Sequence, residues 1–291
     1  MKSRCTVTIM RLLILLALPL LFHGGGHGAD AHKGKRQLRG MTTLRIPSSR
    51  SGEASVAVDV FDPCPGRNCS GDILVLPGWN FPRTKWQEQS PLLAEAEKSG
   101  FRCVFPEMKT TLYESRYFPE TTMKWSATPG GEWIKTVLIP SLQKMGLFRP
   151  GGSNFVMGLS TGGRGAVLVC LRNPGLFRGA ASLSGDFDQT AMRRDRLMTA
   201  VYGPCEKFHQ RWAGTDNPMK TVGLWNTPLY LGHGRADTVV PFSQSESFYR
   251  ALKKQHPRMR LVFNDPKDAG HDFTYWSSEV KPVMEFFLSL L

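Results

Sequence analysis

A serine flanked by glycines is the feature of this chain that most directly suggests chemistry. The pentapeptide Gly158-Leu-Ser-Thr-Gly162 follows an apolar run at 154–157 and precedes a helix-compatible stretch at 166–171. In such a strand–turn–helix setting, a G-x-S-x-G sequence holds its serine in a strained turn, and the glycines let the strand and the helix approach closely. We therefore predict that Ser160 is a nucleophile.

A serine hydroxyl becomes a useful nucleophile only with a base and an acid, and the sequence supplies both downstream. An imidazole removes the hydroxyl proton, and a carboxylate fixes the tautomer of that imidazole. The chain order expected after a G-x-S-x-G turn is Ser, then Asp or Glu, then His, each on a loop after a strand. Asp237 follows the strand-like run 229–231, and His271 follows the strand-like run 260–263. We predict that Ser160, Asp237 and His271 form a catalytic triad.

Other acids and another histidine compete for two of these roles. Asp186 and Asp188 follow the strand after Ser160 and are alternatives for the acid. His233 lies on a glycine turn just before Asp237, where a structural role in that loop is the simpler interpretation. The acid at Asp237 is preferred because its position fits the expected chain order.

The tetrahedral intermediate of acyl transfer needs hydrogen-bond donors for its oxyanion. The backbone N–H of Thr161, directly after the nucleophile, is one expected donor, and the loop after the third strand should supply the other. That loop reads Leu76-Pro-Gly-Trp-Asn80, so Trp79 is the predicted second donor. Each donor would stabilise the transition state by roughly 3 kcal/mol. The run His23-Gly-Gly-Gly26 resembles an oxyanion motif, but it precedes every strand and is rejected.

Strand-like and helix-like segments alternate along the chain. Strands are expected at 42–46, 54–60, 73–76, 102–105, 154–157, 180–183, 229–231 and 260–263, and helices at 91–98, 133–139 and 277–290. This alternation predicts an α/β fold with a mostly parallel central sheet flanked by helices on both faces. The first two strands alternate apolar and polar residues, which is typical of antiparallel strands.

Two segments interrupt the alternation. Residues 107–128 are irregular and rich in aromatic residues, and residues 189–225 carry aromatic side chains among charges. The second segment is interpreted as a small cap-like excursion after the sixth strand, above the edge of the sheet where ligands bind. The alternative is an ordinary surface excursion.

The chain resembles the α/β-hydrolase superfamily, and within it the esterase-D-like branch, which includes S-formylglutathione hydrolases, feruloyl esterases and mycolyltransferases. The resemblance covers roughly residues 54–290 and rests on the segments Gly158–Gly163, Asn173–Phe177, Ser182–Gly185 and Gly270–Trp276. It implies the α/β-hydrolase fold and an acyl-enzyme formed at Ser160, with Asp237 and His271 carried over by motif. Thr161 departs from the methionine often found after the serine, but its N–H is retained.

The N-terminus has the order of regions found in a secretory signal. Three cations precede an apolar run at 12–22 that is too short to span a bilayer, and small residues follow it. We assign residues 1–31 to a signal peptide with an unfixed cleavage site, 32–41 to a flexible linker and 42–291 to the catalytic domain. Met10 is an alternative start, and an uncleaved membrane anchor is the alternative interpretation. The mature chain is expected to be exported, periplasmic or secreted, without stable membrane insertion.

Composition and charge limit the partners. The chain of 291 residues is 41% hydrophobic and carries a formal net charge of +13, which fits one globular core with a basic surface. Such a surface suits acidic polysaccharide or lipid headgroups, or merely aids solubility. The densest basic run, Arg193-Arg-Asp-Arg196, is interpreted as a solvated face, and no aromatic interleaving indicates nucleic acid.

The cysteines indicate an oxidising compartment more than a metal centre. Cys64 and Cys69 flank a short loop that a disulfide could close, whereas Cys103 and Cys170 lie in apolar runs and are expected to be buried thiols. No C-x-x-C pair is present, so neither a metal nor a cofactor is expected.

The sequence therefore favours an exported serine esterase that acts on a small-molecule or polysaccharide-linked ester. Three alternatives stay open: an acyltransferase to a sugar or lipid acceptor, a peptidase, and a catalytically inactive hydrolase-fold protein used for binding. The sequence does not indicate an oligomeric state.

Overall fold

The computed structural model describes residues 40–49 and 54–291. The predicted signal peptide, the linker as far as residue 39 and the rejected His23–Gly26 motif lie outside the described residues. The first strand, β1 (Met41–Pro47), begins inside the range that we assigned to the linker, and the Gly40 carbonyl accepts a hydrogen bond of 2.9 Å from the Asp62 N–H. No helix in the described part of the chain is both long and apolar enough to span a membrane.

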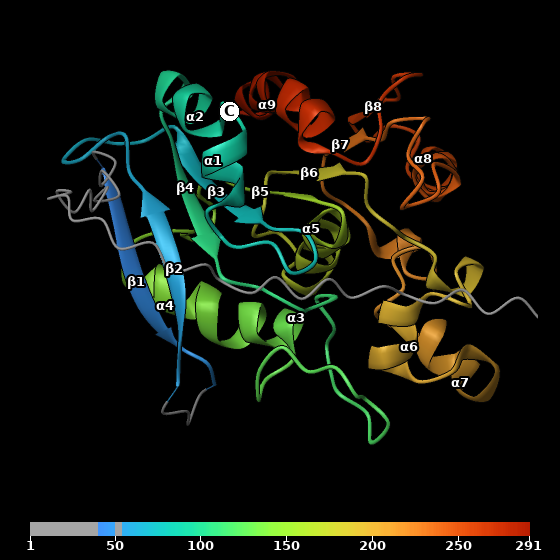
Figure 1. Ribbon diagram of the computed structural model, residues 1–291. Helices are drawn as coiled ribbons and strands as arrows, with labels where there is room; N and C mark the ends of the chain where they lie inside the picture. The colour runs from blue at the N-terminus through green and yellow to red at the C-terminus, as the bar shows by residue number, and fades with distance from the viewer. Residues whose placement is uncertain (1–39, 50–53) are drawn as a thin grey trace, which may run out of the picture. The chain divides into compact units, whose positions relative to one another are not determined.

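The described strands form one eight-stranded sheet, in the order β1-β2-β4-β3-β5-β6-β7-β8 (Figure 1). The other strands are β2 (Ser55–Phe61), β3 (Gly71–Leu76), β4 (Phe101–Pro106), β5 (Asn154–Leu159), β6 (Gly179–Leu183), β7 (Leu229–Gly232) and β8 (Leu261–Asn264). The pairs β1–β2 and β2–β4 are antiparallel, and all the other pairs are parallel. All eight predicted strands are confirmed.

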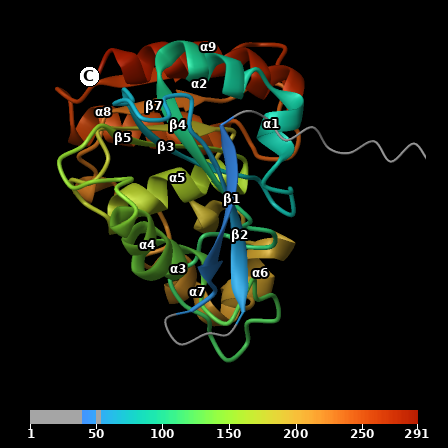
Figure 2. The same ribbon diagram turned by 90° about the vertical axis from the view of Figure 1, so that its left-hand side faces the viewer.

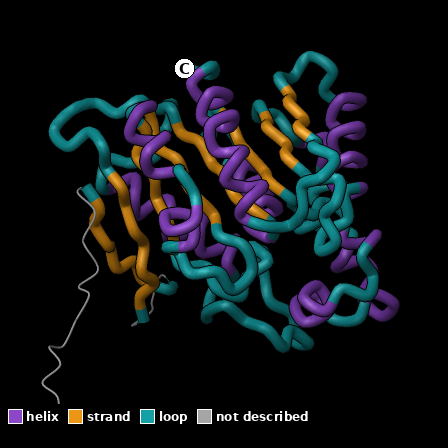
Figure 3. The backbone as a smooth tube through the Cα atoms, turned by 45° about the horizontal axis from the view of Figure 1, so that its top comes forward, coloured by secondary structure: helices purple, strands orange, loops and turns teal. Residues whose placement is uncertain are grey.

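Helices cover both faces of this sheet because neighbouring residues of a strand point to opposite sides. Ile73 and Val75 pack toward α1 (Lys85–Gln89), α2 (Leu92–Ser99) and α9 (Phe273–Leu288). Leu74 and Leu76 pack toward α3 (Gly130–Trp133), α4 (Ile139–Lys144), α5 (Thr161–Arg172) and α8 (Ser243–Gln255). Figures 2 and 3 show the strands between these two helical layers. Burial on both faces explains why the central strands read as continuous apolar runs.

A wide turn joins α3 to α4 into one helical rod. Residues Ile134–Leu138 form a π-helical turn, and the Ile139 N–H donates to the Ile134 carbonyl. Pro140 follows at the start of α4 and has no N–H to continue the ordinary ladder, which accounts for the wider turn at this point.

The segment between β6 and β7 forms a helical lobe, as expected for the cap-like excursion. It contains α6 (Arg196–Tyr202), α7 (Cys205–Trp212) and two short 3-10 turns, Gln189–Ala191 and Val222–Leu224. Figure 1 shows α6 and α7 apart from the two helical layers. The Thr121 hydroxyl donates to the Val201 carbonyl at 2.6 Å, so the irregular loop 107–129 packs against this lobe. We call the lobe and this loop together the cap.

The strand β5 and the helix α5 meet so closely that only glycine fits at the contact. A Cβ atom on Gly158 would lie 2.1 Å from the Gly162 carbonyl oxygen. No real Cβ occupies such a position, so any larger residue would push the nucleophile turn apart.

We predict that Gly158→Ala lowers the free energy of unfolding by about 1–3 kcal/mol or more, because overpacking forces the backbone to shift. Urea unfolding measures this. Gly223→Ala is the matched control, because nothing lies within 4 Å of a Cβ at that position. Equal stability of the two variants would contradict the close contact.

Candidate active site

Ser160 lies in the turn between β5 and α5, in a backbone conformation that few L-residues adopt. Its φ is 53° and its ψ is −125°. The Ser160 N–H donates to the Leu183 carbonyl at 2.8 Å, which ties the turn to β6. A Cβ on Gly162 would lie 2.5 Å from both the Leu76 and the Pro77 carbonyl oxygens. The surrounding contacts therefore hold the strained serine in place.

The structure brings Ser160, His271 and Asp237 into one hydrogen-bonded chain. His271 Nε2 lies 3.0 Å from Ser160 Oγ, and His271 Nδ1 lies 2.7 Å from Asp237 Oδ2. A carboxylate only accepts, so Nδ1 carries the proton and Nε2 is free to accept from the serine hydroxyl. Each side chain follows the carboxyl end of a parallel strand, as the sequence predicts. This is the geometry that proton transfer from serine to imidazole needs.

Asp237 uses all of its acceptor capacity. Its Oδ1 accepts the backbone N–H groups of Val239 and Val240, both at 2.9 Å, and its Oδ2 accepts from His271. His233 Nε2 approaches the same Oδ2 at 3.2 Å. Burial alone raises the pKa of Asp237, but the hydrogen bonds from His233 and His271 outweigh it and hold this pKa well below its usual value. Because this pKa is lowered, Asp237 is an ionised carboxylate at neutral pH.

His233 supports the loop of the acid, in line with the structural role expected from the sequence. Its Nδ1 lies 2.7 Å from Ser245 Oγ, and its Nε2 lies 3.0 Å from the Val240 carbonyl. Because a carbonyl only accepts, Nε2 carries a proton and can also face the Asp237 carboxylate. The ring is fully buried and so fixes the orientation of the acid.

The two rival acids are occupied elsewhere. Asp186 forms an ion pair of 2.9 Å with the buried Arg164. Asp188 caps a short turn, and its Oδ1 accepts from Thr190 and from Asn217 at 3.0 Å. In the described residues neither carboxylate bonds to His271, so the geometry favours Asp237 as its partner.

The two predicted oxyanion donors, Trp79 and Thr161, both lie at the cavity around Ser160. The Trp79 N–H has no hydrogen-bond partner within the described residues. The Thr161 N–H is at the first position of α5, where helix amides point outward unpaired. The Tyr113 hydroxyl donates to the Pro77 carbonyl at 2.7 Å and holds the Trp79 loop. Their role as donors stays a prediction.

The cavity around Ser160 is small and mainly apolar. Its volume is about 260 Å³, and its walls come from the sheet edge and from the cap: Trp79, Phe81, Leu112, Met192, Leu197, Met198, Val239 and Val240. Ser160 and His271 both line it. A cavity of this kind suits an apolar acyl group placed next to a nucleophile. We call it the acyl cavity.

Arg164 connects this cavity to the cap and was missed in the sequence analysis. It is fully buried on α5, one turn after Ser160. Its guanidinium donates to the Leu112 carbonyl at 3.3 Å and pairs with Asp186 in the cavity wall. It also donates to the Gln189 side chain and to the Asp216 carbonyl. An arginine in the otherwise small and apolar run 161–170 was the available signal.

The five cysteines within residues 40–49 and 54–291 are free thiols. Cys103 and Cys170 are buried, as predicted. The predicted bond between Cys64 and Cys69 is not formed, and Cys69 Sγ instead lies 3.5 Å from Asp62 Oδ1. Ligand atoms of these two cysteines and Asp62 lie within 4.8 Å of one another, so the sulfurs are close enough for the disulfide to stay a prediction.

Comparisons with known proteins agree with this architecture. The sequence profile of the prolyl oligopeptidase family matches residues 150–291. No curated protein matches the sequence. Among solved structures, MPT51 (FbpC1) of Mycobacterium tuberculosis is similar with a TM-score of 0.71 and 15% identity, over 86% of this chain and 98% of that chain.

Two further solved structures are similar to this chain. An S-formylglutathione hydrolase from Agrobacterium tumefaciens has a TM-score of 0.69 and 15% identity, over 86% of this chain and 94% of that chain. A fluorophosphonate-binding serine hydrolase of Staphylococcus aureus, FphF, has a TM-score of 0.67 and 15% identity, over 85% of this chain and 98% of that chain. Together with the sheet order and the helical layers, these similarities establish that the chain has the α/β-hydrolase fold.

We predict that Asp237→Asn destabilises the protein at neutral pH and that this difference shrinks in acid. An amide would face two imidazole N–H donors with its own N–H₂ group. Because the native pKa of Asp237 is lowered, its carboxylate stabilises the fold fully above the unfolded pKa of about 3.9, and this contribution is lost as the pH falls further. Unfolding in urea at pH 7 and at pH 3 measures the difference.

Asp268→Asn is the control for that comparison. Asp268 is exposed and has no ion pair within the described residues, so its replacement should leave the stability unchanged at both pH values. A difference between wild type and Asp237→Asn that stays constant down to pH 3 would contradict the lowered pKa.

Proposed function

We propose that the protein is a serine hydrolase that cleaves carboxylic esters through an acyl-enzyme at Ser160. The observation that carries the proposal is the hydrogen-bonded chain from Ser160 Oγ through His271 to Asp237, opening on the acyl cavity. The α/β-hydrolase fold and the similarity to solved hydrolases support it.

In the first half-reaction His271 Nε2 takes the proton of the Ser160 hydroxyl as its oxygen attacks the ester carbonyl. The imidazolium that forms is stabilised by the ionised Asp237, which stays a carboxylate throughout. The amides of Thr161 and Trp79 are proposed to donate to the oxyanion of the tetrahedral intermediate. His271 then gives its proton to the oxygen of the leaving alcohol, and the acyl group stays on Ser160.

In the second half-reaction a water molecule takes the place of the alcohol. His271 removes a proton from that water as it attacks the acyl carbonyl, and then returns the proton to Ser160 Oγ. The acid is released and the enzyme is restored. The apolar walls of the acyl cavity favour an apolar acyl group on a small-molecule or polysaccharide-linked ester. An acceptor alcohol in place of water would turn the same cycle into acyl transfer.

A peptidase is the second candidate, and the match of residues 150–291 to the prolyl oligopeptidase profile favours it. The same residues would then attack an amide, whose nitrogen receives the proton from His271. Parallel assays with p-nitrophenyl esters and peptide p-nitroanilides separate the two candidates. Turnover of the anilides alone would replace the esterase proposal.

Export is proposed as well, on the signal-like N-terminal sequence and the pair Cys64 and Cys69. In an oxidising compartment a small-molecule disulfide would accept the electrons, and each thiol would lose its hydrogen as the Cys64–Cys69 bond forms. The intact mass of protein collected outside the cytoplasm should show loss of about the first 31 residues. It should also show loss of two hydrogens, restored by a thiol reductant.

Cys64→Ser is the control for the mass measurement, because it should abolish the loss of two hydrogens. A full-length exported chain would overturn cleavage of the signal. Retention of both thiol hydrogens in wild type would overturn the disulfide.

We predict that Ser160→Ala lowers kcat for p-nitrophenyl butyrate by at least about 10³-fold, because the nucleophile is removed. Wild type should also form a covalent adduct with a fluorophosphonate probe that mass spectrometry locates at Ser160. Ser243→Ala is the matched control, because Ser243 is exposed at the start of α8 and should keep full activity. Equal turnover by wild type and Ser160→Ala, or an adduct at another serine, would overturn the proposal.

A further inference from the structure

An open groove continues directly from the acyl cavity across the cap. Met192, Asp195 and Val239 line both the acyl cavity and this groove. The groove has a volume of about 610 Å³, and Arg193 and Arg194 also line it, whereas they do not line the acyl cavity. We call it the arginine groove. A substrate that reacts at Ser160 can therefore extend into it without any rearrangement of the backbone.

Two arginines that line the arginine groove carry positive charges that are open to solvent. Arg193 and Arg194 are both exposed, and neither forms an ion pair within the described residues. The Arg193 Nε–H donates to the Thr190 carbonyl at 3.3 Å, which positions the guanidinium and leaves its other N–H groups free. The carboxylate that also lines the groove, Asp195, accepts the Met198 N–H at 2.8 Å as the cap of α6. The lining of the groove thus carries two guanidinium groups and one carboxylate, which leaves a net positive charge.

We propose that the arginine groove binds an anionic group on the alcohol part of the ester, such as a carboxylate, sulfate or phosphate. This inference rests on the proposed esterase function. The acyl cavity has mainly apolar walls, where an unpaired charge would lose its hydration, so the apolar acyl group occupies the cavity. The charged part extends outward past Val239 into the open arginine groove. There it stays in contact with water, and the two arginines supply positive charge and hydrogen-bond donors. The run at 193–196, interpreted from sequence as a solvated face, thereby gains a role.

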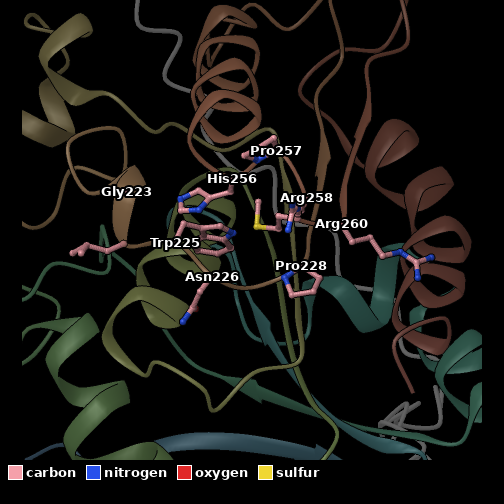
Figure 4. Close-up of a pocket in the computed structure, with 10 residues that line it drawn as sticks. Gly223, Trp225, Asn226, Pro228, His256, Pro257, Arg258 and Arg260 are labelled. Atoms are coloured by element: carbon pink, nitrogen blue, oxygen red, sulfur yellow. The ribbon is translucent and has the colours of Figure 1, made fainter.

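A second groove, at the amino ends of the strands, offers a matched control. It has a volume of about 630 Å³ and is lined by Trp225, His256, Arg258 and Arg260 among others (Figure 4). Pro228 and Arg260 directly precede β7 and β8, whereas Asp237 and His271 follow these strands. Because the two strands are parallel, this groove lies at the amino ends of the strands, whereas Ser160 lies at their carboxyl ends. Its arginines should not influence an ester bound at the nucleophile.

The test compares two esters of nearly the same size and shape, the charged 4-carboxyphenyl butyrate and the neutral 4-carbamoylphenyl butyrate, whose different leaving-group acidity affects every variant alike. The ratio of their kcat/KM values is measured for wild type, for Arg193→Gln/Arg194→Gln and for Arg258→Gln/Arg260→Gln. We expect the double change at 193 and 194 to lower the ratio by about fivefold, mainly through KM. The effect should fade in about 1 M salt, where exposed charges are screened. The control variant should keep the wild-type ratio.

Two further measurements locate the anion and separate this inference from the proposed function. p-Nitrophenyl hemisuccinate carries its charge on the acyl side, and a preference for it that depends on Arg193 and Arg194 would overturn the assignment to the alcohol. Calorimetric binding of 4-carboxyphenyl butyrate to Ser160→Ala needs no turnover and should weaken about fivefold when both arginines are replaced.

The outcomes are therefore distinct. Turnover of both esters with an unchanged ratio in Arg193→Gln/Arg194→Gln would leave the esterase standing and overturn the anion site. Absence of turnover together with arginine-dependent binding would keep the anion site and overturn the esterase. An equal fall of the ratio in the control variant would reduce the effect to the net charge of the protein and overturn the site.

Discussion

The buried guanidinium of Arg164 is the interaction on which the arrangement of the site depends. It lies on the helix that begins at the nucleophile, yet most of its acceptors belong to the cap: Leu112, Gln189 and Asp216. Removing one partner of a buried ion pair costs about 3–5 kcal/mol, because the remaining charge stays buried and unpaired. The cap can therefore hardly separate from α5 while Arg164 and Asp186 stay charged. Through this residue, the wall of the acyl cavity and the turn of Ser160 form one rigid unit.

The second constraint is the fixed orientation of the acid. Asp237 accepts two backbone N–H groups on one oxygen and faces two imidazoles with the other, so its carboxylate has no freedom to rotate. His271 in turn packs edge-on against the Trp276 ring, with 4.9 Å between the ring centroids. An imidazole held between a carboxylate and an indole presents Nε2 to Ser160 at little further entropic cost.

The sequence predicted the sheet and the placement of Ser160, Asp237 and His271 after the ends of strands, since both follow local rules. Apolar runs mark strands buried on both faces, and Gly158 and Gly162 mark a contact that admits no Cβ. The helix α8 and those of the cap were not predicted, because these segments are rich in polar and charged residues and only a few of their side chains are buried, so tertiary packing decides their structure. Arg164 was missed for a related reason, because its partners lie 22 to 52 residues away in sequence. A pattern of residues that are neighbours in the sequence does not indicate hydrogen bonds between residues so far apart in the chain.

The walls of the acyl cavity come from two different parts of the chain, the loops after the strands and the cap. Ser160, Asp237 and His271 follow the carboxyl ends of parallel strands, while Leu112, Leu197 and Met198 of the cap line the acyl cavity. In the proposed enzyme, chemistry and selectivity therefore reside on separate stretches of chain, and insertions or exchanges in the cap would alter selectivity without changing the catalytic residues. Such an exchange has one requirement, however. The Arg164 guanidinium on α5 would remain buried, so any replacement cap would have to provide oxygen atoms that accept its hydrogen bonds.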